Sequence, residues 1–171
     1  MSEVLKDVNK PSHNLRAEML LRLLGVKAAG AGTAEAGRAA VATFLTAQKV
    51  DVAGWDLQDG SGLSRSDLVT ARGLVDLLAA MDKHPHGAAF RDSLPVAGVD
   101  GTLKRRLSGP RLQGRIHAKT GTLRHTGALA GYATPARGDR MAFAILVNNA
   151  TAPGGDIQDA IDEVAEALIV P

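Results

Sequence analysis

Cysteine, aromatic side chains and long apolar runs are scarce or missing in this chain of 171 residues. Without cysteine it can form neither disulfides nor thiolate metal sites. Aromatic residues make up 3%, too few for the stacking platforms on which proteins bind single-stranded nucleic acid. No apolar run approaches the roughly 20 residues that cross a bilayer, so we expect no membrane span.

An excess of charge of one sign is missing as well. The 20 Lys and Arg residues against 18 Asp and Glu give a formal net charge of +2, which is no reason to expect a nucleic-acid partner. Residues 1–6 also lack the apolar stretch of a signal peptide. What is present, 45% hydrophobic and 22% charged residues, is typical of a globular protein, and the length suits a single domain over residues 1–171.

The spacing of apolar residues predicts four longer helices, over residues 12–24, 33–49, 66–81 and 156–169. Ser12 or Asn14 is the expected N-cap of the first helix, and Gly25 is its expected end. Thr33 and Ser66 are the expected N-caps of the second and third helices.

The second half of the chain changes its pattern. Prolines and glycines interrupt residues 85–98, where one or two short helices are expected. Residues 115–122, 126–133 and 140–148 then have the composition and alternation of strands, joined by turns short enough for an antiparallel meander. Helices, then consecutive strands, then a helix predict an α+β fold with an antiparallel sheet flanked by helices.

Two short motifs carry the functional argument. A Ser-His-Asn at residues 12–14 stands at the expected start of the first helix, where capping alone would explain the Ser and the Asn. A Lys-Thr-Gly-Thr at residues 119–122 lies on the first expected strand, where a lysine guarding a sheet edge and a glycine at a bulge are an equally plain explanation. In this order, however, they are two of the three elements of the serine-acylating signature of penicillin-binding proteins and β-lactamases.

The sequence around both motifs extends the match. The chain resembles the C-terminal half of the class C low-molecular-mass penicillin-binding proteins, the D-alanyl-D-alanine carboxypeptidase/endopeptidase family. The segments that carry the resemblance, in the family's order, are KPSHNL at 10–15, DGSGLS at 59–64, LPVAGVDGTL at 94–103, HAKTGTL at 117–123, LAGY at 129–132 and VNN at 147–149. The resemblance implies a penicillin-binding, β-lactamase-like transpeptidase fold and a periplasmic or other extracytoplasmic location.

The resemblance also implies a substrate and its binding residues. The expected substrate is a peptidoglycan stem peptide ending in D-Ala-D-Ala, lying as an added strand along the edge strand that holds Lys119. The hydroxyls of Thr120 and Thr122 would bind its terminal carboxylate, and Gly121 would leave room for its backbone. The backbone N–H of Thr122 would form half of an oxyanion hole. β-Lactams are the expected inhibitors of the complete enzyme.

Three residues are implied to be catalytic. Ser12 would relay a proton to the leaving D-alanine nitrogen, and Lys119 would hold Ser12 in place across the cleft. Asn14 would hydrogen-bond the penultimate amide of the substrate and orient the lysine partner of the nucleophile. His13 is expected to be a bystander.

The third element of the signature is missing. The family's nucleophile is the Ser of a Ser-x-x-Lys motif, activated by the lysine one helical turn away. No Ser in the chain has a Lys three residues later, and Thr46 with Lys49 has the spacing but comes after the Ser-x-Asn element, in the wrong order. The chain is therefore expected to be the second half of a two-part active site, unable to acylate alone.

Two alternatives remain open. The first expectation is a piece of a longer serine-type D-Ala-D-Ala carboxypeptidase or endopeptidase. The alternatives are a pseudoenzyme that binds cell-wall peptides or a partner protein, and an assembly in which another chain supplies the nucleophile. Without the nucleophile helix, the apolar faces of the first and third helices and one side of the sheet should be partly uncovered, so we also expect marginal stability or self-association.

Other candidate sites are weaker. We expect no cofactor and no metal, because the glycines at 30–37 miss the dinucleotide-binding spacing and no third ligand is spaced to join His84 and His86. His117 falls on the Lys119 face of its strand, where packing is its expected role. The basic cluster within residues 104–115 is expected to be a solvated face.

Overall fold

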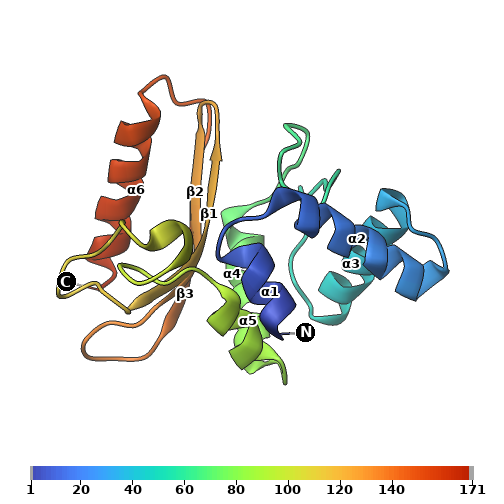
Figure 1. The fold of residues 1–171 in the computed structure, drawn as a ribbon, viewed down its shortest axis with the longest axis horizontal. Coiled ribbons are helices and arrows are strands. Elements are labelled where there is room, and N and C mark those ends of the chain that lie inside the picture. The colour runs from blue at the N-terminus through green and yellow to red at the C-terminus, as the bar shows by residue number, and fades with distance from the viewer. Residues whose placement is uncertain (1, 170–171) are drawn as a thin grey trace.

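The structure is a computed structural model that describes residues 2–169, and it has the expected α+β architecture (Figure 1). Helices form the first part of the chain and a three-stranded sheet with a closing helix forms the second. In chain order the elements are α1 (Ser2–Asn9), α2 (Asn14–Ala29), α3 (Ala34–Ala47), α4 (Ala71–Lys83), α5 (Gly87–Ser93), a 3₁₀ turn η1 (Gly101–Leu103), β1 (Ile116–Leu123), β2 (Thr126–Ala133), β3 (Met141–Val147) and α6 (Gly154–Ala167).

The sheet is the predicted antiparallel meander. Its strand order is β1-β2-β3, with Lys119 opposite Ala130 and Leu129 opposite Ile145. Each strand lies within one residue of its predicted bounds at either end. The turn between β1 and β2 places His125 at a φ of 64°, in the left-handed region that tight hairpins require.

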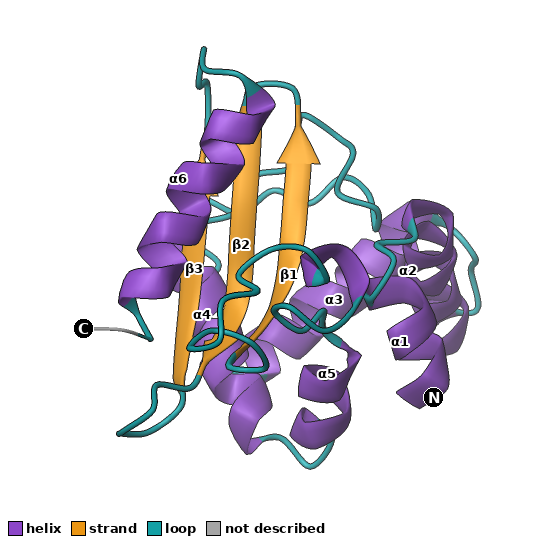
Figure 2. Cartoon of the chain, turned by 60° about the vertical axis from the view of Figure 1, so that its left-hand side comes forward, coloured by secondary structure: helices purple, strands orange, loops and turns teal. Residues whose placement is uncertain are grey.

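The main core lies between the sheet and α6, which covers one face of the strands (Figure 2). Leu129 and Phe143 from the sheet pack there with Ile157 and Ile161 from α6, all of them buried. The approach is close at Gly127, where a Cβ would lie 2.7 Å from Cγ2 of Ile157. Burying side chains of this size stabilises the fold by about 1.5–3 kcal/mol each.

The opposite face of the sheet is covered by α4 and the segment that follows it. Leu78, Leu94 and Tyr132 form a second buried cluster there, with Phe90 packed against it. The Tyr132 hydroxyl donates a 2.8 Å hydrogen bond to the carbonyl oxygen of Leu78, and burial raises the pKa of Tyr132 to about 12. This cluster fixes the helical part of the chain against the sheet.

Helices α2 and α3 form a hairpin that stands away from the sheet (Figure 1). They approach closely at Gly37, where a Cβ would lie 2.2 Å from the carbonyl oxygen of Leu21. Thr33 is the N-cap of α3, as predicted, and its hydroxyl accepts a hydrogen bond from Ala36 N at 3.1 Å.

The start and end of α2 differ from the sequence prediction. Neither Ser12 nor Asn14 is its N-cap, because Ser12 has a left-handed φ of 57° and His13 takes the cap position. Gly25 does not end the helix either. It is buried inside α2, and the left-handed Gly30 ends the helix instead, at a φ of 70°.

Two further predictions about the helices were wrong or incomplete. The third helix begins at Ala71 with Thr70 as N-cap, not at Ser66, because Thr70 Oγ1 accepts the hydrogen bond from Gly73 N. Helix α1 was not anticipated. In the loop that precedes α4, Asp56 pairs with Leu68 in an isolated bridge.

Much of the apolar surface of α2 is exposed, as expected for the first predicted helix. Leu21 is its buried leucine, whereas Leu15, Met19, Leu23 and Leu24 are 47–67% exposed. Helix α4 is better covered, since Leu78 is buried and its other leucines are partly buried. Within residues 2–169 no helix combines the length and apolar character needed to cross a membrane.

Candidate active site

The structure brings two of the predicted catalytic residues together. Nζ of Lys119 donates a hydrogen bond to Oγ of Ser12 at 2.7 Å and a second to the carbonyl oxygen of Thr120 at 2.8 Å. Ser12 lies in the turn between α1 and α2, and Lys119 is in the first half of β1. The bond therefore joins the helical part of the chain to the edge of the sheet.

The turn that carries Ser12 is held in an unusual conformation. Its φ of 57° costs a residue with a side chain about 1 kcal/mol relative to ordinary helical or extended backbone. Two hydrogen bonds impose it, from Ser12 N to the carbonyl oxygen of Asn9 at 3.3 Å and from His13 N to that of Val8 at 2.8 Å. The turn directs the hydroxyl of Ser12 at Lys119.

The surroundings of Lys119 change its acid–base behaviour. Burial lowers the pKa of Lys119 from its ordinary 10.5 to about 8. Among residues 2–169 no carboxylate lies within ion-pair distance of its Nζ. A lysine with such a pKa is about one-tenth neutral at pH 7, so it can exchange a proton with a hydroxyl that it contacts.

The other residues of the Lys-Thr-Gly-Thr motif lie along the outer edge of β1. The N–H of Ala118 already points to that side, where it donates to the carbonyl oxygen of Pro95. Because hydrogen-bonding directions alternate along a strand, the backbone groups of Thr120 and Thr122 point to the same side. The segment that pairs with Ile116–Ala118 does not extend along them, so the edge is open to another strand.

The side chains of this motif alternate between the two faces of the sheet. Lys119 and Gly121 share the face turned toward Ser12, while Thr120 and Thr122 lie on the other. Oγ1 of Thr120 is hydrogen-bonded to Oγ1 of Thr102 at 2.8 Å. At Gly121 a Cβ would meet Cβ of Ala128 at 3.3 Å, a close contact with one neighbouring side chain.

Asn14 and His13 are both exposed at the start of α2. Asn14 is the first residue of the helix and stands two positions after Ser12. His13 caps the helix through Nδ1, which accepts from Arg16 N at 3.5 Å. The structure thus gives His13 a local role away from Lys119.

His117 stands two residues before Lys119 and is half-buried, in line with the predicted packing role. Its Nδ1 is buried and finds no hydrogen-bond partner among the described residues. Burial lowers the pKa of His117, and the charges of Lys10 and Arg91 lower it further. The neutral ring is therefore the favoured form.

Aspartate side chains organise the loop over residues 56–70. The Asp59 carboxylate accepts from Gly62 N at 2.6 Å and from Ser64 N at 2.9 Å. Burial alone would raise the pKa of Asp59, but these hydrogen bonds outweigh it and the pKa is lowered. Arg65 ties the loop to the β1–β2 turn by donating to the carbonyl oxygen of Arg124 at 3.3 Å.

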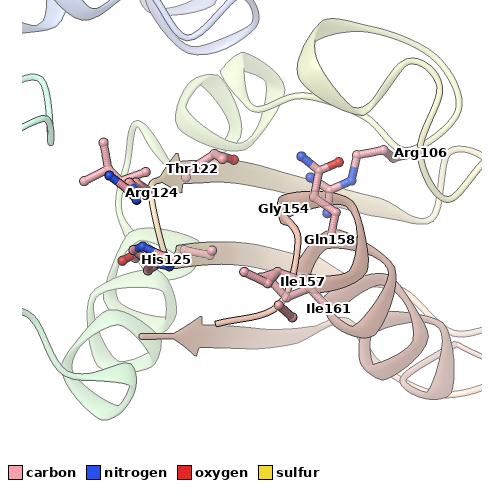
Figure 3. Close-up of a pocket in the computed structure, with 14 residues that line it drawn as sticks. Arg106, Thr122, Arg124, His125, Gly154, Ile157, Gln158 and Ile161 are labelled. Atoms are coloured by element: carbon pink, nitrogen blue, oxygen red, sulfur yellow. The ribbon is translucent and has the colours of Figure 1, made fainter. Parts of the chain in front are cut away.

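A cavity of about 220 Å³ lies beyond the open edge, between the β1–β2 turn and the start of α6 (Figure 3). Ile157 and Ile161 form its apolar side, and Thr122, Arg124 and Gln158 supply polar groups. Gly121 and Thr122 of the motif also line it, whereas its residues from α6 had no sequence signal, because the cavity forms only when α6 packs on the sheet.

The remaining sequence candidates do not assemble into sites. Within residues 2–169 no three His, Asp or Glu side chains are grouped so that they could hold a metal ion. Nδ1 of His84 already accepts from His86 N at 3.2 Å. Oγ1 of Thr46, the only Ser or Thr hydroxyl in the sequence with a lysine three residues later, donates to the carbonyl oxygen of Ala42 in its own helix.

Comparisons with known proteins agree on one family. The sequence profile of the D-Ala-D-Ala carboxypeptidase 3 (S13) family matches residues 1–168. A D-alanyl-D-alanine carboxypeptidase from an Actinomadura species is 44% identical over 94% of this chain and 31% of its own length. The curated relatives are matched over 31–37% of their length, so the chain spans about a third of each.

Solved structures show the same fold. Penicillin-binding protein 4 from Haemophilus influenzae matches with a TM-score of 0.87 and 30% identity, over 98% of this chain and 39% of its own. A second structure of that protein, in complex with a novel β-lactam, matches with a TM-score of 0.82. An extended-spectrum β-lactamase shares the fold at 18% identity, with a TM-score of 0.74 over 98% of this chain and 62% of its own.

Proposed function

Since the chain belongs to the D-Ala-D-Ala carboxypeptidase 3 (S13) family, we propose that it is the substrate-reading half of a serine-type D-Ala-D-Ala carboxypeptidase or endopeptidase. The observation that carries the proposal is the 2.7 Å hydrogen bond between Lys119 Nζ and Ser12 Oγ, which places both motifs at one edge of the sheet. In this proposal residues 1–171 form one partial transpeptidase domain that acts on peptidoglycan outside the cytoplasm.

Substrate binding follows from the open edge of β1. A peptide that ends in D-Ala-D-Ala adds as a strand beside Thr120 and Thr122, and its backbone pairs with their outward-facing groups. The charge of Lys119 attracts its terminal carboxylate, which favours a free C-terminus, while the hydroxyl of Thr122 at the strand edge offers a further hydrogen bond. At Gly121 a Cβ would crowd Cβ of Ala128, at 3.3 Å, and would also stand beside the incoming strand, so a glycine there keeps the edge clear.

Catalysis then depends on three side chains. Ser12 gives its hydroxyl proton to the leaving D-alanine nitrogen and regains one from the nucleophile through the hydrogen-bonded groups of the site. Lys119 holds the Ser12 oxygen, and its lowered pKa lets it accept or return a proton near neutral pH. Asn14 binds the penultimate amide, and the N–H of Thr122 stabilises the negative oxygen of the tetrahedral intermediate.

The nucleophile comes from outside these 171 residues, which contain no Ser-x-x-Lys. The chain alone therefore binds substrate without forming an acyl-enzyme, and β-lactams inhibit the complete enzyme. The same sequence fact favours a second candidate, a pseudoenzyme that binds cell-wall peptides or a partner protein. An in-frame Ser-x-x-Lys upstream in the gene supports the first candidate, and a start codon at Met1 with its own ribosome site supports the second.

Calorimetric titration of the chain with a tripeptide ending in D-Ala-D-Ala tests the proposal. We expect binding, and we expect the C-terminal amide of the same peptide to bind at least about tenfold more weakly because the carboxylate is lost. Equal binding of the acid and the amide, or no binding of either, would contradict a site that recognises a free C-terminal carboxylate.

A further inference from the structure

The ammonium group of Lys10, two residues before Ser12, is surrounded by oxygen acceptors. Its Nζ donates to the carbonyl oxygen of Leu94 at 2.6 Å and to the two carboxylate oxygens of Asp100 at 2.7 and 2.9 Å. The Lys10 side chain is 19% exposed. Since an ammonium group has three N–H donors, its hydrogen-bonding capacity is used inside the protein.

Leu94 and Asp100 belong to the loop over residues 94–103, and the backbone around Lys10 is bonded to this loop as well. Thr102 N donates to the carbonyl oxygen of Lys10 at 3.1 Å, and Val96 N donates to Oδ1 of Asp100 at 2.9 Å. Gly101 has a φ of 58°, and a Cβ there would lie 2.7 Å from the carbonyl oxygen of Lys10. Only glycine permits this approach, so the loop closes tightly around the lysine.

The loop is also tied to β1 on both sides of Lys119. Ala118 N donates to the carbonyl oxygen of Pro95 at 2.9 Å, and the hydroxyls of Thr102 and Thr120 share a hydrogen bond of 2.8 Å. The strand is therefore anchored at the residue before Lys119 and at the residue after it.

These contacts close a ring around the candidate site. The ring runs from Ser12 back along the chain to Lys10, through Asp100 and the loop to β1, and from Lys119 to Ser12 again. A closed ring fixes the distance between Ser12 and Lys119, because neither can move without breaking the ion pair or lifting the loop from the strand.

We infer that Lys10 and Asp100 are positioning residues that hold the Ser12 hydroxyl against Lys119 without touching substrate. Their importance for catalysis rests on the proposed function, whereas their effect on Lys119 can be measured without it. Loss of the pair frees the turn that carries Ser12, admits water to Lys119 and removes the burial that distinguishes this lysine from an exposed one.

The experiment measures how the acetylation of Lys119 depends on pH in the chain itself. Acetylation of each lysine by acetic anhydride is followed by mass spectrometry as the pH is raised, which gives a pH midpoint for Lys119, with the exposed Lys27 as internal reference. Burial is the cause of the lowered pKa of Lys119, so the expected midpoint is about 8. In Lys10→Met and in Asp100→Asn it should rise by at least about one pH unit.

Two control variants separate positioning from general effects. Lys6→Met removes an exposed lysine of α1 that pairs only with Glu3, and should leave the Lys119 midpoint unchanged. Lys10→Arg keeps a charge that can pair with Asp100, and should hold the midpoint nearer to that of the wild type than Lys10→Met does.

An unchanged midpoint in folded Lys10→Met and Asp100→Asn overturns the inference. Loss of the circular dichroism signal of the folded chain in both variants overturns it too, because the pair would then serve folding and not position. A chain that binds no D-Ala-D-Ala peptide but shows the midpoint shift contradicts the proposed function and leaves the positioning role intact.

Discussion

Nζ of Lys119 and Oγ of Ser12 lie 2.7 Å apart although 107 positions separate the two residues in the chain. Ser12 is held at a left-handed φ, and Lys119 is partly buried with no carboxylate partner among residues 2–169. Both features cost stability, and strain and burial of this kind collect where a protein positions groups for chemistry.

Removing the Ser12 hydroxyl should abolish most of the activity of the complete enzyme. In Ser12→Ala the leaving nitrogen loses its proton donor, so we expect the peptidase rate to fall by about 10²–10⁴-fold. The matched control is His13→Ala, which removes only a helix cap and should leave the rate almost unchanged. Release of D-alanine gives both rates, and equal activity of Ser12→Ala and wild type would contradict the relay.

Peptide affinity should depend on the charge of Lys119. The pKa of this lysine is lowered to about 8, so the ammonium form that attracts a carboxylate is present below that pH and is lost as the pH rises through it. We expect affinity for a D-Ala-D-Ala peptide to be level near pH 6–7 and to fall by up to about tenfold per pH unit above 8. Calorimetry from pH 6 to pH 9 measures this affinity. An affinity that rises with pH would contradict the role of the Lys119 charge in binding the carboxylate.

Addition of a β-lactam to the chain alone should leave its mass unchanged. The 171 residues contain no Ser-x-x-Lys, so a fluorescent penicillin has no activated nucleophile to acylate. Intact-mass measurement reads the result directly, with the complete enzyme as positive control. A stoichiometric adduct on the chain would show that one of its own hydroxyls is the nucleophile.

The exposed face of α2 should drive self-association. Met19 and Leu23 are 57% and 48% exposed on the same side of the helix, and apolar patches of this kind tend to bind one another. Met19→Lys with Leu23→Lys should shift the chain toward monomer in sedimentation experiments. Leu63→Lys, at a similarly exposed leucine in a loop, is the control that should not. A wild-type chain that is monomeric at high concentration would refute the expectation.

The α2–α3 hairpin should tolerate no side chain at Gly37. A Cβ there would lie 2.2 Å from the carbonyl oxygen of Leu21, so Gly37→Ala must push the helices apart, at a cost of about 1–3 kcal/mol. Gly32→Ala, where the nearest atom is 3.4 Å away, should change stability by less than about 0.5 kcal/mol. Chemical denaturation measures both, and equal midpoints would mean that the hairpin is not close-packed at Gly37.

Local sequence signals were sufficient for the sheet and insufficient for the helix starts. Short turns and strand alternation act between neighbouring residues, so β2 was predicted at Thr126–Ala133, as observed. Ser12 was expected to be in the helix or at its cap because serine favours that position, but its backbone is held by Val8 and Asn9. Ser66 was misassigned for a similar reason, since it lies in a loop organised by aspartates.

Of the residue pairs in the candidate site, one was predicted from the sequence and one was not. The pairing of Ser12 with Lys119 was implied by the family resemblance, which rests on motifs that can be read along the chain. The pairing of Lys10 with Asp100 was not, because an ion pair between residues 90 positions apart leaves no periodic signal. Both lie in segments that carry the family resemblance, yet only the folded structure gives them a role.

The most direct test of the account compares the affinity of the wild-type chain and of Lys119→Ala for a peptide ending in D-Ala-D-Ala at pH 7. Lys104→Ala, at an exposed lysine outside the motif, is the matched control. We expect Lys119→Ala to lose at least about tenfold in affinity, since the carboxylate loses its charged partner, and Lys104→Ala to bind as the wild type does. Equal affinity of Lys119→Ala and wild type would contradict a substrate site at Ser12, Lys119 and the open edge of β1.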